Sequence, residues 1–318
     1  MPQNRLSPRM QTTAKLAEIH KQIVALEGQG IIEKSNAAYY SQVHLAPKGP
    51  DAWRFCIDYR NLNNCTAAGT GWPLPYIRQV YERIGHHNPT IFGVIDFKAG
   101  YHQTVLAQRC RELFAFTTAF GIYQPKTLPF GPKGAPSYFQ MLMCTKVLVG
   151  LIYLICEVYL DDILHWGQDI DSYCKNLRTI LHRIQQHALT LNPTKCKFGL
   201  ISVTYVGHTL DASGISIDVS KVVKILKFAK PQTQKELKSF LGLCNYVRDY
   251  IAGYAEYSSP LDKLLGTYER KRTLIWTQEC DSAFIGLCEA INKSQKLFFF
   301  RERAPVFLET DASTYCIS

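Results

Sequence analysis

The first regular pattern along the chain is the recurrence of apolar side chains at the spacing of an amphipathic helix. Within residues 13–28 these side chains are three or four positions apart: Leu16, Ile19, Ile23 and Leu26. Such spacing places all four on one face of a helix, and Gly28 and Gly30 are typical of a helix end. The pattern therefore predicts a helix from Thr13 to Gly28.

A strand-rich region is indicated after this helix. Residues 42–45 and 53–58 flank the segment Pro47-Lys48-Gly49-Pro50-Asp51, whose composition is typical of a hairpin tip. That tip carries a single lysine, Lys48. We therefore expect two strands joined by a short connection that exposes one cation.

Two later apolar runs end on acidic residues. Residues 90–96 read TIFGVID and predict a buried strand that ends on Asp96. Residues 151–160 are largely apolar, are followed by Asp161 and Asp162, and give way to further apolar residues. This second pattern indicates a hairpin with two acids at its turn.

Helical patterns are expected to replace strands after about residue 197. Lysines recur there at every third position, with apolar residues between them: Lys221, Lys224, Lys227 and Lys230. A helix with this sequence has one apolar and one basic face. The basic face could follow a phosphate backbone, or it could simply face solvent.

Two more helices and a final strand are predicted in the same part of the chain. The segment Thr233-Gln234-Lys235-Glu236 fits a capping box, and apolar residues continue at helical spacing as far as Val247 and Ile251. A third helix should run from about residue 279 to 293 on its apolar positions. A short strand is expected over residues 306–309.

Composition indicates a globular protein and favours a polyanionic partner. The 318 residues, 47% of them hydrophobic, suffice for one large domain or two to three modest ones. The formal net charge is +10, which raises the odds of nucleic-acid binding. Many soluble proteins are equally basic, so charge by itself does not decide the partner.

Neither a membrane anchor nor an export signal is indicated. The longest apolar stretch, residues 147–160, contains Glu157 and is shorter than the roughly 20 residues that span a bilayer. Residues 1–15 are polar and contain Pro2 and Pro8, unlike a signal peptide. The 11 cysteines form no C-x-x-C pair, so neither a disulfide framework nor a zinc knuckle is indicated. We expect a cytoplasmic protein with reduced cysteines and no membrane partner.

Three carboxylates are candidates for metal binding if their strands are neighbours. Asp96 ends one strand, and Asp161 and Asp162 lie at the expected hairpin turn. Divalent hard cations take oxygen ligands, and two Mg²⁺ ions between such acids can activate a 3′-hydroxyl and neutralise a leaving pyrophosphate. From these residues alone, a pair of acids at a solvated turn is the commoner situation.

Six motifs follow one another along most of the chain. They are WRFCIDYRNLN at 53–63, IDFKAGYHQ at 95–103, LPFGPKGAP at 128–136 with Phe139-Gln140, YLDDIL at 159–164, LNPTKC at 191–196 with YVGH at 205–208, and KELKSFLGL at 235–243. In this order they resemble the reverse transcriptase of LTR retrotransposons, specifically the gypsy class. A single match could arise by chance, whereas six in register indicate the family.

The resemblance implies an α+β fold of the right-hand polymerase type, with a palm sheet and helices, fingers and a helical thumb. The implied boundaries are 1–200 for fingers and palm, 201–265 for the thumb, 266–304 for a connecting segment and 305–318 for the start of a further domain. Residues 307–313, FLETDAS, resemble the first strand of ribonuclease H, with Asp311 at its first metal-ligand position. Because the chain then ends, we expect an incomplete ribonuclease H part, and a polyprotein piece or truncated copy.

The resemblance also implies which residues carry the chemistry. Asp96 and Asp161 would bind two metal ions, Mg²⁺ or alternatively Mn²⁺, with Asp162 as an accessory acid beside them. Arg54 and Lys48 match the fingers residues that grip the incoming triphosphate, and a guanidinium suits bidentate phosphate contact. For both cations, an ordinary surface position is the alternative.

Further matches concern the nucleotide and the template. Tyr101 matches the aromatic residue that lies under the sugar ring and excludes a ribose 2′-hydroxyl, with a core tyrosine as the alternative. Phe130 and Gly131 would pack against base and template, where a ring can stack on any base, although core packing could also explain Phe130. Lys133 is a candidate phosphate contact.

The remaining matches concern the primer strand. Gly207 and His208 would hold the primer end, unless they only form a structural turn. Lys221, Lys224 and Lys227 would follow the nucleic-acid backbone from the thumb. The implied enzyme is an RNA-directed DNA polymerase whose partners are an RNA or DNA template with its primer and deoxynucleoside triphosphates. A homodimer remains open.

The sequence departs from the family pattern at two places. The fingers tip is diluted by Ala46, Pro47 and Pro50, where the family has several basic residues. The paired acids are followed by His165-Trp166 in place of small and aliphatic residues, and a buried imidazole needs a hydrogen-bond partner. The alternative to an active polymerase is a catalytically decayed relic that still binds nucleic acid. The diluted fingers tip and the incomplete ribonuclease H part favour this alternative, whereas the presence of all three aspartates favours the enzyme.

Overall fold

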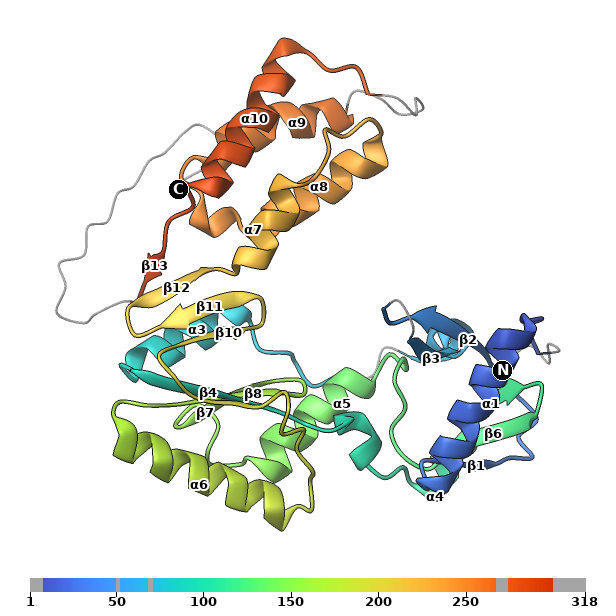
Figure 1. The fold of residues 1–318 in the computed structure, drawn as a ribbon. Helices are drawn as coiled ribbons and strands as arrows, with labels where there is room; N and C mark the ends of the chain where they lie inside the picture. The colour runs from blue at the N-terminus through green and yellow to red at the C-terminus, as the bar shows by residue number, and fades with distance from the viewer. Residues whose placement is uncertain (1–7, 50–51, 68–70, 267–273, 300–318) are drawn as a thin grey trace. The chain divides into compact units, whose positions relative to one another are not determined.

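The computed structural model describes residues 8–49, 52–67, 71–266 and 274–299 (Figure 1). Packing divides the chain into two compact units. The first unit comprises residues 1–75, 93–165 and 174–198, and the second unit comprises residues 76–92, 166–173 and 199–318. Residues 50 and 51 at the hairpin tip, the strand predicted over residues 306–309 and the expected ribonuclease H segment with Asp311 lie outside the described residues.

The first unit contains a five-stranded sheet against which the N-terminal helix packs. In order across the sheet, its strands are β1 (Ile32–Lys34), β6 (Gly121–Pro125), β5 (Phe116–Thr118), β2 (Ser41–Pro47) and β3 (Trp53–Asp58). Helix α1 (Thr13–Gly28) buries Ile19 and Ile23 in one core with Val43 and Phe116 of the sheet. The predicted helix and the antiparallel pair β2–β3 are therefore confirmed.

A second sheet carries the acidic strand ends. Its strands lie in the order β7 (Cys156–Tyr159), β8 (Asp162–Gly167), β4 (Ile91–Asp96) and β9 (Lys197–Leu200). Helices α5 (Ala135–Leu142) and α6 (Ile170–Gln186) contribute Phe139 and Ile180 to the core that also holds Ile95, Val158 and Ile163 of the sheet. The strand that ends on Asp96 is confirmed, and it adjoins β8 of the acidic hairpin, which was the condition for a shared metal site.

The strand before the paired acids is shorter than the apolar run predicted. Only Cys156–Tyr159 is a strand, whereas residues 151–155 form turns, with one isolated bridge from Ile152 to Cys156, and Tyr153 has a φ of 72°. The side chains of Leu151 and Ile155 pack against the core of the second sheet. Their apolar character therefore reflects core packing by turn residues and not strand pairing.

Shorter elements and one long helix accompany these two sheets. The short elements are α2 (Arg60–Cys65), η1 (Gly100–Gln103), α4 (Gln108–Arg111), η2 (Glu112–Phe114) and the π-helical η3 (Met143–Val147). The sequence patterns discussed above did not predict α6, although it spans Ile170–Gln186 and is amphipathic. Within the described part of the chain, no helix is both long and apolar enough to cross a membrane.

The second unit combines a short sheet with helices. Its strands are β10 (Ser202–Tyr205), β11 (His208–Asp211), β12 (Gly214–Ile217) and β13 (Leu297–Phe298), in that order. Its helices are α3 (Ile77–His86), α7 (Val219–Leu226), α8 (Gln234–Tyr246), α9 (Tyr254–Gly266) and α10 (Gln278–Asn292), with the single turn η4 (Arg248–Tyr250) after α8. Because β10 to β12 precede α7, the expected change from strands to helices at residue 197 is wrong and occurs near residue 218.

The three predicted helices of this unit are present, with two corrected ends. Thr233 Oγ1 accepts a hydrogen bond from Glu236 N, and the Glu236 carboxylate accepts one from Thr233 N, so the capping box is confirmed. Helix α8 ends at Tyr246, and Val247 and Ile251 lie beyond it because the turn η4 intervenes. Helix α10 matches the helix predicted over residues 279–293.

The predicted lysine-bearing helix ends earlier than the lysine spacing suggests. Helix α7 ends at Leu226, Lys227 is its C-cap and Lys230 lies outside it. Lys230 forms an ion pair with Asp281 and lies 4.6 Å from the centroid of the Trp276 ring. The four lysines therefore do not form one helical face, because only the first two lie within the helix.

Candidate active site

Asp96 is the last residue of β4 and is anchored through its backbone. Its carbonyl oxygen accepts a hydrogen bond from Asn192 N at 2.9 Å. Its side chain is 17% exposed, and Oδ2 lies 3.3 Å from Lys195 Nζ. The other carboxylate oxygen, Oδ1, is buried and has no hydrogen-bond partner among the described residues. A buried carboxylate with one oxygen unsatisfied is costly unless a cation or proton approaches it.

Asp161 is presented by an unusual two-residue turn. Tyr159 of β7 pairs with Asp162 of β8, so Leu160 and Asp161 form the loop between the strands. Leu160 has a φ of 58°, and Asp161 is not among the residues with positive φ. Positive φ at only the first loop residue is the pattern of a type II′ turn, in which glycine is favoured at that position. A leucine there costs about 1–3 kcal/mol of backbone strain, which the surroundings must hold in place.

The three acids influence one another electrostatically. Burial, and then repulsion from Asp161 and Asp96, raise the pKa of Asp162 to about 6, while Lys195 acts in the opposite direction. Gly100 allows this crowding, since a Cβ at this glycine would lie 3.7 Å from the Asp161 Cβ and 3.2 Å from a Phe139 ring carbon. The fold thus gathers negative charge at one end of the second sheet.

This arrangement fits a divalent cation, although it does not form a closed ligand cage. Within the part of the chain that the structure describes, no three His, Cys, Asp or Glu side chains gather closely enough to hold a metal ion. The unsatisfied Oδ1 of Asp96 and the raised pKa of Asp162 both indicate a shortage of positive charge there. A divalent ion with oxygen ligands would supply that charge.

Tyr101 lies beside Asp161 and packs against two aromatic rings. It is 8% exposed, and its ring centroid is 4.8 Å from that of Phe130 and 5.0 Å from that of Phe139, both nearly edge-on. Burial, and then the charge of Asp161, raise the pKa of the Tyr101 phenol. Phe130 itself is 51% exposed. The ring of Tyr101 is thus held rigidly beside Asp161, while Phe130 offers a surface for stacking.

The loop that follows Phe130 is fastened to helix α2 by an asparagine. Asn63 Nδ2 donates to the Gly131 carbonyl at 3.0 Å, and Lys133 N donates to Asn63 Oδ1 at 2.7 Å. Gly131 has a φ of 107°, and a Cβ there would lie 3.2 Å from the Tyr59 ring. The predicted contacts Gly131 and Lys133 therefore depend on Asn63, which belongs to the first motif but was not among the predicted site residues.

The predicted phosphate-gripping cations lie in the β2–β3 hairpin. Arg54 is exposed on β3 opposite Ala46, and Lys48 is exposed after β2, with its backbone N donating to Ala52 O at 2.7 Å. Both side chains are accessible to a ligand, and nothing in the described residues tests whether they bind one. Their role stays a prediction.

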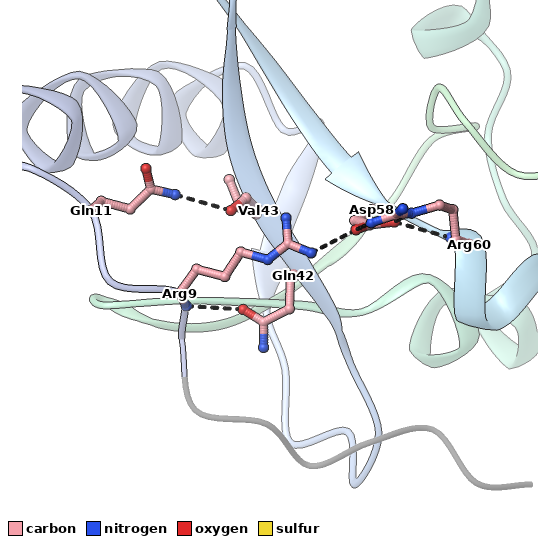
Figure 2. Close-up of polar contacts among 6 residues, drawn as sticks. All are labelled: Arg9, Gln11, Gln42, Val43, Asp58 and Arg60. Carbon is pink, nitrogen blue, oxygen red and sulfur yellow. Dashed lines mark hydrogen bonds and ion pairs between the residues drawn. The ribbon is translucent and has the colours of Figure 1, made fainter. Parts of the chain in front are cut away.

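The other end of β3 is occupied by a carboxylate with two arginine partners (Figure 2). Asp58 Oδ2 lies 2.7 Å from both Arg60 Nη2 and Arg9 Nη2. Arg9 N also donates to Gln42 Oε1 at 3.1 Å, and Gln11 Nε2 donates to Val43 O at 3.2 Å. Hydrogen bonds from Arg60 are the largest cause of the strongly lowered pKa of Asp58. These bonds fasten the segment before α1 to the hairpin that carries Arg54.

In the second unit, His208 is enclosed by aromatic residues. It is 6% exposed, and its ring centroid lies 5.1–5.6 Å from those of Tyr81, Tyr246 and Tyr250. Its Nδ1 is 2.9 Å from the Tyr81 hydroxyl, and burial lowers its pKa. These residues line part of a groove of about 900 Å³. His208 thus orders the β10–β11 turn, and a direct contact with primer stays a prediction.

The neighbours of this turn include one of the predicted lysines. Gly207 has a φ of 79°, and a Cβ there would lie 2.6 Å from the Tyr246 hydroxyl. The ammonium of Lys221 lies over the Tyr246 ring, 5.3 Å from the ring centroid, in a cation–π contact. Lys224 and Lys227 are exposed. Tyr246 therefore contacts both the β10–β11 turn and the first turn of α7.

Comparison with known proteins agrees with this arrangement of acids and aromatic residues. The family described as reverse transcriptase (RNA-dependent DNA polymerase) matches residues 46–210. The chain belongs to this reverse transcriptase family. Membership implies dependence on divalent metal ions in general. The resemblance inferred from the motifs is thereby confirmed at the level of the family.

Relatives of this reverse transcriptase domain are Pol polyproteins of transposons. The chain is 33% identical to the retrovirus-related Pol polyprotein from transposon opus of Drosophila melanogaster, over 94% of this chain and 31% of that protein. It is 31% identical to the corresponding polyprotein from transposon 297, over 94% of this chain and 28% of that protein. The chain thus spans about a third of the length of the curated relatives it matches.

Solved structures confirm the polymerase fold of the reverse transcriptase domain. The foamy viral protease-reverse transcriptase in complex with double-stranded DNA matches with a TM-score of 0.83 and 22% identity, over 97% of this chain and 54% of that chain. The same viral protein in complex with an RNA/DNA hybrid matches with a TM-score of 0.76 and 24% identity, over 93% of this chain and 40% of that chain. The predicted α+β fold is therefore confirmed.

The predicted site residues of the reverse transcriptase domain fall into two groups. The first unit holds Lys48, Arg54, Asp96, Tyr101, Phe130, Gly131, Lys133, Asp161 and Asp162, and the second holds Gly207, His208, Lys221, Lys224 and Lys227. Within the first unit, Asp96 and Asp161 lie near enough to Asp162 to raise its pKa, and Asp161 lies near enough to Tyr101 to raise the pKa of the phenol. Sequence reasoning missed Lys195 beside Asp96, although it lies inside the quoted motif LNPTKC.

The unusual histidine after the paired acids should make stability depend on pH. His165 of β8 is fully buried, and burial lowers its pKa to about 4, from 6.5 for the unshifted group. In the unfolded chain the His165 imidazole takes up a proton near pH 6.5, whereas in the folded protein it does so only near pH 4. Protonation of this imidazole therefore leaves the free energy of unfolding unchanged above pH 6.5 and lowers it progressively as the pH falls towards 4. We expect the free energy of unfolding to fall by about 2 kcal/mol from His165 alone between pH 7 and pH 5.

Urea unfolding at the two pH values would measure this effect. In His165→Leu, the difference in the free energy of unfolding between pH 7 and pH 5 should be smaller by about 2 kcal/mol than in the wild type, because the other histidines titrate alike in the two proteins. The exposed His182→Leu on α6 is the control and should keep the full dependence. An unchanged pH dependence in His165→Leu would show that this imidazole does not titrate as burial requires.

Proposed function

We propose that this chain is an RNA-directed DNA polymerase that extends the 3′-hydroxyl of a primer with deoxynucleoside triphosphates. The observation that carries the proposal is the electrostatic influence of Asp96 and Asp161 on Asp162, with Tyr101 beside Asp161, in a chain of the reverse transcriptase family. Two structural neighbours are reverse transcriptases bound to double-stranded DNA and to an RNA/DNA hybrid. This supports a primer–template as the partner.

In this proposal, acids of the first unit bind the metal ions and a cation of the same unit contacts the triphosphate. Asp96 and Asp161 would hold Mg²⁺ ions, with Asp162 adding negative charge beside them. When bound, such ions lower the pKa of the attacking hydroxyl and neutralise charge on the leaving pyrophosphate. The exposed guanidinium of Arg54 can contact phosphate oxygens through two parallel hydrogen bonds.

Primer extension on a homopolymer RNA template, with purified protein and either Mg²⁺ or Mn²⁺, tests this function. We expect a labelled DNA primer to lengthen only when both a divalent ion and the complementary deoxynucleotide are present. Primer–template binding without any extension would instead support the alternative, a decayed relic that still binds nucleic acid. The same protein with Asp161→Asn serves as the background.

Lysines of the second unit should contribute a salt-dependent part of binding. Each lysine that contacts a phosphate displaces condensed counterions, at a slope of roughly 0.9 per contact on duplex DNA. Replacing Lys221, Lys224 and Lys227 by glutamine should therefore flatten the slope of log affinity against log salt by up to about three units. Fluorescence anisotropy with a labelled primer–template over a series of salt concentrations measures the slope.

A matched control separates contact from net charge. The exposed Lys146, Lys175 and Lys197 can be replaced by glutamine to give the same change in charge. This control should shift the slope by less than about one unit, since these positions lie outside the predicted contact. An unchanged slope in the first triple variant would mean that those lysines only face solvent.

A further inference from the structure

The strained turn that contains Leu160 and Asp161 needs a restraint, and helix α5 supplies one. Gln140 lies on α5, is 1% exposed and belongs to the same unit as the turn. Its Oε1 accepts a hydrogen bond from Leu160 N at 2.6 Å. Its Nε2 donates to Val158 O at 3.0 Å. One buried amide therefore bonds to the backbone of both neighbours of Tyr159, which are Val158 and the positive-φ residue Leu160.

The direction of the amide is defined by its partners. Leu160 N can only donate and Val158 O can only accept, so an inverted amide would lose both bonds. The second hydrogen of Nε2 is directed to Cys144 Sγ at 3.4 Å, which satisfies the remaining donor. A buried side chain with all its polar atoms bonded in one orientation restrains the groups it contacts.

We propose that Gln140 is a positioning residue that holds Leu160 in its left-handed conformation and thereby directs Asp161 towards Asp96. A leucine at this position of the turn gains from relaxing to negative φ, because only glycine adopts positive φ without strain. That relaxation would rotate the peptide that precedes Asp161 and would move its carboxylate. The amide of Gln140 opposes it by fixing the N–H of Leu160. The inference rests on the proposed function, since it assigns Asp161 to catalysis.

The first test replaces the amide by a side chain of similar size. Gln140→Met fills the same volume without the two backbone bonds. We expect kcat for primer extension to fall by about tenfold, while KM for the primer–template stays within about twofold. We also expect Mn²⁺ binding, followed by electron paramagnetic resonance without substrate, to weaken by about tenfold. A Gln140→Met protein with wild-type kcat and Mn²⁺ affinity would overturn the proposal.

The decisive test is rescue by a second substitution. In Leu160→Gly the turn residue adopts positive φ without strain, so the restraint becomes less necessary. Adding Leu160→Gly to Gln140→Met should therefore recover at least half of the lost Mn²⁺ affinity, on a logarithmic scale. If Gln140 only supports packing of α5, the two effects will add and no recovery will occur.

Two further measurements keep this inference separate from the proposed function. Backbone amide exchange of the peptide around Leu160 should be at least about tenfold faster in Gln140→Met, whether or not the protein polymerises DNA. Failure of wild-type primer extension would refute the function, whereas unchanged exchange would refute the restraint. Thr145→Val is the control, because it removes a partly buried hydrogen bond to Met141 O near the same helix. It should leave exchange at Leu160 within about twofold.

Discussion

Replacing Asp96 or Asp161 by asparagine is expected to abolish measurable primer extension while primer–template affinity stays within a few fold. Each substitution removes one of the charged oxygens that would hold a divalent ion, and an amide replaces it poorly. The cations that would contact nucleic acid are untouched. Extension with labelled primer and affinity by fluorescence anisotropy measure the two quantities separately.

The control for these variants is an acid of the same protein outside the site. Asp171→Asn removes an exposed carboxylate in the first turn of α6 and should leave extension within about twofold. Near-wild-type extension in Asp96→Asn or Asp161→Asn would refute their assignment to the active site. Loss of primer–template affinity along with extension would indicate that the acids support the fold and not the chemistry.

Shortening Tyr101 to alanine or valine should raise ribonucleotide incorporation relative to deoxynucleotide incorporation by at least tenfold. The two substrates differ by one hydroxyl, so selecting the smaller sugar requires a steric barrier that penalises the larger one. The Tyr101 ring is suited to this, because Phe130 and Phe139 hold it edge-on beside Asp161. A tenfold change corresponds to about 1.4 kcal/mol of lost discrimination.

The ratio of the two values of kcat/KM is the quantity to measure, since it is independent of any decline in overall extension. Tyr101→Phe is the matched control, because it keeps the ring and removes only the hydroxyl. It should retain the wild-type ratio. If Tyr101→Ala also retains that ratio, the tyrosine is a packing residue and the sugar must be selected elsewhere.

Elements whose signal is local could be predicted from the chain alone. Helix α1, the β2–β3 pair and the capping box of α8 each depend on residues a few positions apart, and all three are present. Periodic burial and capping act over one or two turns, so neighbouring residues contain most of the information. The motifs likewise identified the family, because chemistry restricts residue types at catalytic positions.

Tertiary contacts decided where several of these elements end. The lysine spacing predicts a longer helix than α7, but Lys230 lies outside it and pairs with Asp281 and the Trp276 ring. The apolar run before the paired acids predicts a long strand, but its first residues fill the core from turns. In each case the partner that determines the outcome is remote in sequence, so no local pattern contains it.

The same division applies to the candidate site. The sequence identifies Asp96, Asp161 and Tyr101 as candidates, since the motifs name them directly. It does not show that Gln140 bonds to Leu160 or that Lys195 lies against Asp96, 99 positions away. The first contact depends on how α5 packs on the β7–β8 hairpin. The second depends on the segment around residue 195 lying beside the end of β4. Residue types follow from chemistry, whereas their restraint follows from packing, because a hydrogen bond forms only where the fold brings donor and acceptor together.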